Sequence, residues 1–205
     1  MIKNIKEINF LMILRYFLVA PLVNISIFFP HLAAADFEVP VELQAKLFLT
    51  AFTYDNNLER REGKQLNIGI LYFPEVSKSK DEAMDFSKAL DSFKSKKVGG
   101  LSIGNVLLAY NGNVDLKNKI LTNGINMLYV ASGKNNIVKE VTKVAKSEKV
   151  LSFTGLVEYV TECGISMAVG LKANKPKIYL NLSSAKEEGA DFSAKFLRIV
   201  EIMEE

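Results

Sequence analysis

The chain has few of the side chains that usually carry covalent chemistry, with one histidine and one cysteine in 205 residues. The histidine, His31, lies in an N-terminal segment that we expect to be removed on export. Ser-His-Asp and Cys-His arrangements need an imidazole base, and the usual zinc sites need imidazoles or several thiolates. We therefore expect a mature protein that is not an enzyme, with no catalytic residue, no metal and no cofactor.

A single cysteine also excludes an intramolecular disulfide. In an oxidising compartment an unpaired cysteine is either buried or a reactive thiol. Its neighbours Gly164, Ile165 and Met167 favour a buried Cys163. A free reactive thiol, and a link between the two copies of a homodimer, are the lesser alternatives.

The N-terminus has the three-part layout of a secretory signal peptide. Basic residues precede an apolar run, Tyr16 to Phe29, and the small-residue segment Ala33-Ala34-Ala35 follows it. Cleavage after Ala35 would remove residues 1–35 and leave residues 36–205 as one domain in the periplasm. No second apolar run follows, so we expect no stable membrane insertion after cleavage.

An uncleaved membrane anchor is the alternative for this segment. It would join Ile8 to Phe29 into one span and would place Arg15 inside the hydrocarbon. An arginine near the bilayer centre costs about 2.5 kcal/mol or more. We therefore favour cleavage.

The basic character of the chain belongs largely to this leader. The full chain has 26 basic and 23 acidic residues, and without the three basic and one acidic residues of the leader 23 and 22 remain. A near-neutral chain lacks the electrostatic footprint of a nucleic-acid-binding protein. We therefore expect no nucleic-acid partner.

Apolar periodicity predicts strands and helices in alternation along most of the chain. Ser79 to Glu82, at the start of one predicted helix, have the S-x-x-E sequence of a capping box. The predicted strands are 66–73, 101–110, 125–130 and 150–153, and the predicted helices are 41–54, 79–93, 114–122 and 135–147. No tight two-residue turn joins these strands, so they call for helical crossovers and a mainly parallel sheet covered on both faces.

The pattern changes near the C-terminus. Residues 165–172 and 177–182 are two alternating runs around a short turn, which indicates an antiparallel hairpin. A last helix is predicted with Asp191 as its N-cap, followed by Phe192, Phe196, Val200 and Met203 on one side. The expected fold is a three-layer α/β domain with a C-terminal antiparallel hairpin.

Two local patterns suggest enzyme chemistry only formally. Gly100 to Gly104 matches the G-x-S-x-G nucleophile elbow, but Ser102 lies before or inside a strand and has no base to activate it. Glycines that admit a bend are the better interpretation. Glu158 and Glu162 lie one helical turn apart near Cys163, and without a third ligand they are more typical of an exposed face.

Residues 150–202 resemble the C-terminal half of the YfiR-like family of exported bacterial proteins. The features that carry the resemblance are the strand Val150 to Phe153, the glycine-led strand Gly164 to Val169, the strand Ile178 to Leu182, and the step Gly189 to Arg198 into a last helix. Residues 39–74 resemble the opening helix and first strand of the family. The chain departs from the family pattern in having no tryptophan and no paired cysteines.

The resemblance implies a regulator that acts by contact. It would bind the periplasmic domain of an inner-membrane diguanylate cyclase or similar receptor, and so lower cyclic-di-GMP and biofilm formation. A partner surface is expected at Leu47, Phe48, Phe52 and Tyr54. The alternative is that all four are core residues, and for Phe48 and Phe52 this is the better interpretation. The alternative function is a periplasmic small-ligand-binding sensor; an enzyme that depends on Ser102 or Cys163 ranks last.

Asn181 interrupts the apolar strand that ends at Leu182. Its amide could bind the backbone at the strand-to-helix turn, which is the structural interpretation that we favour. A role at the ligand-binding end of the sheet is the second interpretation.

Overall fold

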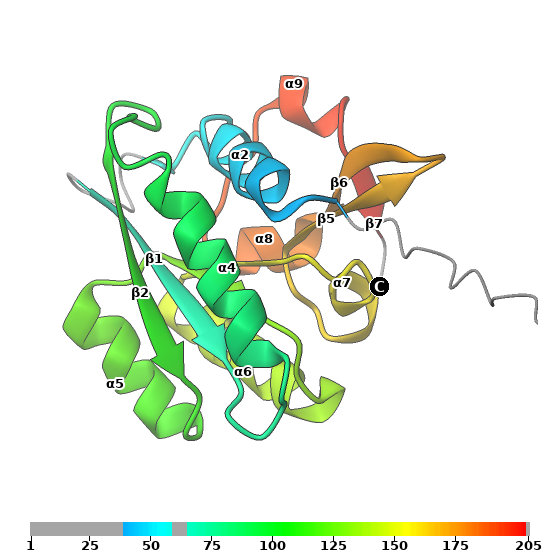
Figure 1. The fold of residues 1–205 in the computed structure, drawn as a ribbon. Coiled ribbons are helices and arrows are strands. Elements are labelled where there is room, and N and C mark those ends of the chain that lie inside the picture. The colour runs from blue at the N-terminus through cyan, green and yellow to red at the C-terminus, as the bar shows by residue number, and fades with distance from the viewer. Residues whose placement is uncertain (1–38, 59–64, 204–205) are drawn as a thin grey trace, which may run out of the picture. The chain divides into compact units, whose positions relative to one another are not determined.

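Parallel strands form most of the sheet in the computed structural model, which describes residues 39–58 and 65–203. Within these ranges the sheet has seven strands in the order β2-β1-β3-β4-β5-β6-β7. β2, β1, β3, β4 and β5 run parallel to one another, β6 is antiparallel to β5, and β7 is parallel to β6. Figure 1 shows β1 beside β2, and the hairpin of β5 and β6. The strands are β1 Gln65–Tyr72, β2 Ser102–Ala109, β3 Met127–Val130, β4 Leu151–Thr154, β5 Met167–Lys172, β6 Lys175–Asn181 and β7 Glu201–Met203. The expected α/β class, with a mainly parallel sheet and an antiparallel pair near the C-terminus, is confirmed.

The helices pack on the sheet in two layers, each with its own core. Their bounds are α2 Val41–Phe52, α4 Ser79–Asp91, α5 Asn113–Asn123, α6 Asn135–Glu148, α7 Glu158–Glu162, α8 Leu182–Glu187 and α9 Ala194–Leu197. Apolar residues of α2 and α4 pack with Leu66, Ile68 and Ile70 of β1, whereas those of α5 and α6 pack with Leu71 and Leu128. Because alternate residues of a strand point to opposite faces, β1 contributes to both cores.

Two turns follow directly from the sequence. Gly124 ends α5 in the left-handed conformation, with φ of 56°, as the Asn-Gly pair predicts. Ala173 and Asn174 join β5 to β6, and both have positive φ, 49° and 60°. Positive φ at both central residues is typical of a tight hairpin turn that matches the twist of the strands.

The predicted capping box at the start of α4 is wrong. The N-cap is Lys78, and no side chain caps this end of the helix. The Ser79 hydroxyl instead accepts a hydrogen bond from the backbone N–H of Phe73 at 2.9 Å. Glu82 turns away from the helix end toward Ser132. Tertiary contacts therefore use both side chains that the local pattern assigned to the cap.

The predicted long C-terminal helix is also wrong. α9 has four residues, is preceded by Ser193 as N-cap, and gives way to β7. Asp191 is held at the end of α2 instead: its backbone N–H donates to Asp55 Oδ1 at 2.8 Å, and its carbonyl accepts from Asn56. Pairing of residues 201–203 with β6 takes the place of further helical turns.

The predicted leader, residues 1–35, lies outside the described residues. None of the helices in the described ranges combines the length and the apolar character needed to cross a bilayer.

Candidate functional site

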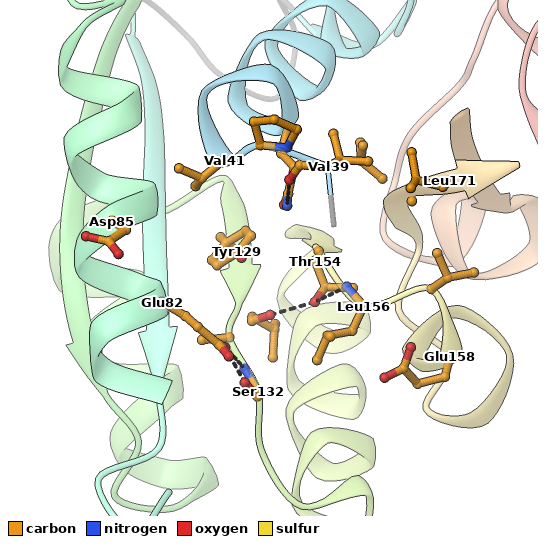
Figure 2. A pocket seen from close by; sticks show the side chains of 18 residues that line it. Val39, Val41, Glu82, Asp85, Tyr129, Ser132, Thr154, Leu156, Glu158 and Leu171 are labelled. Atoms are coloured by element: carbon orange, nitrogen blue, oxygen red, sulfur yellow. Dashed lines mark hydrogen bonds between the residues drawn. The ribbon is translucent and has the colours of Figure 1, made fainter. Parts of the chain in front are cut away.

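A cavity of about 550 Å³ opens at the carboxyl ends of β3, β4 and β5. Residues 129–132, 154–158 and 169–171 line it where these strands end, and the beginning of α2 and one side of α4 complete the wall (Figure 2). α4 follows β1 and leads to β2, which pairs with one edge of β1, whereas the next strand, β3, pairs with the other edge of β1. The order of the strands therefore reverses between β1 and β3. In open parallel sheets this reversal of strand order at the carboxyl edge is the usual place for a ligand.

Glu82 joins α4 to the loop that follows β3. The backbone N–H of Ser132 donates to Glu82 Oε2 at 2.8 Å, and the Ser132 hydroxyl donates to the same oxygen (Figure 2). The other oxygen of Glu82 lies 3.5 Å from Lys78 Nζ, whose side chain is 69% exposed. Glu82 and Ser132 are 50 residues apart in sequence, and no local pattern predicts either of them as a site residue.

Tyr159 of α7 holds the same loop from the other side. The N–H of Gly133 donates to the Tyr159 hydroxyl at 2.8 Å, and that hydroxyl donates to the Gly133 carbonyl at 2.7 Å. Burial raises the pKa of Tyr159, so the hydroxyl keeps its proton and can donate. Residues 131–134 are therefore fixed by side chains from two different helices.

The loop after β4 is held by its own strand. The Thr154 hydroxyl donates to the Val130 carbonyl at 2.7 Å and accepts from the Leu156 N–H at 3.3 Å (Figure 2). Thr154 itself is fully buried. These bonds couple the carboxyl ends of β3 and β4, which form the floor of the cavity.

Gln44 of α2 brings an unsatisfied acceptor to the wall. Its amide nitrogen donates to the Val39 carbonyl at 2.7 Å. Its oxygen, Oε1, is buried and has no hydrogen-bond partner among the described residues. The oxygen lies against Gly155, where a Cβ atom would be only 2.7 Å away. A buried acceptor without a donor costs free energy, and a ligand with a donor can recover it.

The remaining wall is mainly apolar. Val39, Val41, Leu156, Val169 and Leu171 line it from three different elements. Tyr129 also lines the cavity, and its ring stacks on Phe86 with centroids 3.8 Å apart and an interplanar angle of 5°. The cavity thus has apolar walls and a few polar groups in fixed positions, which is the usual composition of a small-molecule site.

The residues considered for a partner surface lie against the core, as the alternative interpretation predicts for Phe48 and Phe52. Phe48 and Phe52 are completely buried, and their rings pack on Phe153 at centroid distances of 4.6 and 5.2 Å. Tyr54 is partly buried and stacks on Phe196 at 5.4 Å, and Leu47 is partly buried against the same core. The apolar stripe of α2 therefore faces the sheet.

Asn181 ends β6 beside the amino end of β5, because the two strands are antiparallel. The cavity lies at the other end of β5, where that strand finishes. It is the N-cap of α8, where its Oδ1 accepts from the Ser184 N–H at 2.9 Å. Its amide group donates to the Val160 carbonyl at 3.4 Å. The structure thus places this side chain in a strand-to-helix turn and outside the cavity.

The residues considered for enzyme chemistry do not come together. Ser102 is exposed at the amino end of β2, after a turn in which Gly99 and Gly100 have positive φ. Cys163 is buried and its thiol lies 3.7 Å from the Asn135 carbonyl; burial raises its pKa and so disfavours the thiolate. Within the described ranges no three of the usual metal-ligating side chains cluster.

Glu158 and Glu162 differ in surroundings despite their helical spacing. Glu158 lines the cavity, whereas Glu162 accepts a hydrogen bond from the Asn135 side chain at 2.6 Å. Both side chains are exposed, as the sequence predicts. The sequence gives no signal that Glu158 also lines a pocket.

Comparison with known proteins shows the fold. No family model matches the chain, and no curated protein matches it either, so its membership of the YfiR-like family stays a prediction. A conserved domain protein from Vibrio cholerae O1 biovar El Tor has a similar structure, with a TM-score of 0.56 at 13% identity, over 82% of this chain and 61% of that one. The ABC domain from Streptococcus pneumoniae in complex with L-Trp is similar too, with a TM-score of 0.55 at 15% identity, over 80% of this chain and 62% of that one.

A third structure, an open, ligand-free substrate binding protein from Clostridium difficile, has a TM-score of 0.49 at 16% identity, over 72% of this chain and 57% of that one. The chain spans about three fifths of the length of the first two structures. The function expected from the family resemblance, repression of a diguanylate cyclase by contact, is contradicted: the similar structures include an L-Trp complex, and Phe48 and Phe52 of the expected contact surface are core residues. The chain therefore has the fold of α/β proteins of which at least one holds a small molecule.

Proposed function

We propose that this chain is an exported, non-enzymatic small-ligand-binding protein whose ligand occupies the cavity at the carboxyl ends of β3, β4 and β5. The observation that carries the proposal is the cavity itself. Its volume of about 550 Å³ lies within the range of ordinary ligand sites, roughly 300–1,000 Å³. Its position at the carboxyl edge of the parallel strands, beside the reversal of strand order, supports the same assignment.

Two further observations support the proposal. The fold is shared with a domain that was crystallised with L-Trp, a ligand of suitable size for such a cavity. The polar groups of the cavity are held by hydrogen bonds to loops and helices, so that a site is formed before a ligand arrives. Preformed polar groups lower the entropic cost of binding. The predicted leader supports export, and the ligand would then be a solute of the cell envelope.

The absence of tryptophan offers a direct experiment. Leu171→Trp places one indole at the rim of the cavity, and Leu121→Trp, at a side chain that is 61% exposed on α5, is the matched control. The purified protein is titrated with phenylalanine, phenylalanine amide, phenethylamine and 3-phenylpropionate. Calorimetry on the unmodified protein measures the affinity of each compound.

We expect saturable one-to-one binding of at least one compound, with a change in emission for Leu171→Trp and none for Leu121→Trp. If no compound in the panel gives saturable heat, the proposed function is wrong. A change confined to Leu121→Trp would place the ligand outside the cavity and would also refute it.

A further inference from the structure

The backbone donors beside the cavity are already used by the protein. Three N–H groups at the carboxyl edge donate to side chains of the chain itself: that of Ser132 to Glu82, that of Gly133 to Tyr159, and that of Leu156 to Thr154. The first two precede α6, and N–H groups in this position are those with which α/β proteins commonly hold an anion. In this chain a ligand carboxylate or phosphate would have to displace Glu82 or Tyr159 to reach them.

The side-chain groups at the wall, by contrast, include acceptors. Gln44 Oε1 has no hydrogen-bond partner among the described residues. Glu158 is exposed, and its carboxylate lies across the cavity from that of Glu82 (Figure 2). An ionised carboxylate and an amide oxygen can only accept hydrogen bonds.

The charged side chains that line the cavity are all acidic among the described residues. Glu82, Asp85 and Glu158 line the cavity, and none of the described lining residues is lysine, arginine or histidine. The cations that pair with the first two are outside the lining: Lys78 lies 3.5 Å from Glu82, and Lys88 lies 3.0 Å from Asp85. The two lysine side chains are about 70% exposed and that of Asp85 is 60% exposed, so water screens these pairs strongly. The described lining thus has carboxylates and no cation, which favours a cation over an anion in the cavity.

We infer that the ligand of the cavity is an amphipathic cation: an ammonium, amidinium or guanidinium group on an apolar body. This inference rests on the proposed function and specifies its ligand class. The cationic group donates to Gln44 and lies close to the carboxylate of Glu158. The apolar body packs against the aliphatic side chains from the beginning of α2 and the end of β5. A bound anion would meet carboxylates and would find the nearby backbone donors already paired.

The test compares two probes that differ only in the sign of the charge. Phenethylamine and 3-phenylpropionate have the same ring and a similar short chain, and both are titrated into the purified protein by calorimetry at low ionic strength. We expect phenethylamine to bind at least tenfold more tightly. Tighter binding of 3-phenylpropionate, or equal binding of the two, would overturn the ligand class while leaving the proposed function intact.

Charge-removing variants identify the groups responsible. Glu158→Gln removes one carboxylate from the wall and should weaken phenethylamine binding by about fivefold, as expected for one charge at about 4 Å in a wet site. Asp81→Asn, an exposed change on α4 outside the lining, should leave the affinity within about twofold. If Glu158→Gln and Asp81→Asn have the same effect, the inference is wrong, since general electrostatics would then explain the preference. If no probe of either charge binds, and phenylalanine and its amide also fail, the proposed function itself fails.

Discussion

A buried glutamate makes the stability of this fold depend on pH in an unusual direction. Glu188 is completely buried at the end of α8. Its carboxylate accepts from the Ser152 N–H at 2.7 Å and the Ser152 hydroxyl at 2.6 Å, and the Ser166 hydroxyl donates to it as well. Desolvation outweighs these bonds and raises the pKa of Glu188 from 4.5 to about 7.

The sign of the effect follows from linkage. A carboxyl group with a raised pKa in the folded state retains its proton where the unfolded chain has lost it. Its contribution to stability is therefore complete below pH 4.5 and is lost as the pH rises through about 7. The difference between the two pKa values corresponds to about 3 kcal/mol.

Glu188→Gln should remove this dependence. A glutamine cannot ionise, and its amide oxygen can still accept from Ser152 and Ser166. We expect the variant to match the original protein near pH 4.5 and to exceed it at pH 8 by up to about 3 kcal/mol in the free energy of unfolding. Urea denaturation followed by circular dichroism at four pH values between 4.5 and 8 measures the difference.

Glu187→Gln is the matched control, because the neighbouring side chain is 54% exposed. Its effect should change little over the same pH range. A difference between Glu188→Gln and the original protein that stays constant from pH 4.5 to 8 would refute the reasoning, because it would show that Glu188 titrates alike in the folded and unfolded states.

Two further predictions concern the core. Phe153→Ala should lower the free energy of unfolding by about 3–5 kcal/mol, because the ring contacts four other aromatic rings. Phe93→Ala, two residues beyond the end of α4 at a partly buried side chain, should cost clearly less, and equal losses in denaturant titrations would contradict the packing described. Cys163 should react with a thiol-specific disulfide reagent only as the protein unfolds, because it is buried and its pKa is raised. Rapid labelling of the native protein would contradict this placement.

Local patterns predict most of the strands and helices. Each strand from β1 to β6 lies within two residues of its predicted bounds at either end, since alternation and β-branched residues specify strands that are buried on both faces. The last helix fails for a physical reason: Phe192, Phe196, Val200 and Met203 have nearly helical spacing, but residues 201–203 gain ladder hydrogen bonds at the open edge of β6. Spacing alone cannot decide between these outcomes.

The site is less accessible to sequence reasoning than the fold. Glu82 has the spacing of a capping residue, and only tertiary structure brings it to Ser132. Gln44 and Glu158 have no local signal at all. The position of residues in the chain is the signal that could have located the site. Residues that follow the predicted strands 125–130 and 150–153 lie at the carboxyl edge of the sheet, where ligands of parallel sheets usually bind.

The loop that joins β3 to α6 has a consequence for how occupancy of the cavity is communicated. Glu82 of α4 and Tyr159 of α7 bind neighbouring residues of this loop, Ser132 and Gly133. The loop therefore connects two helices that are far apart in the chain. Displacement of the Glu82 carboxylate would leave the amide proton of Ser132 open to exchange with solvent. Deuterium uptake at this amide therefore measures, without any label, whether the connection between α4 and the loop is intact.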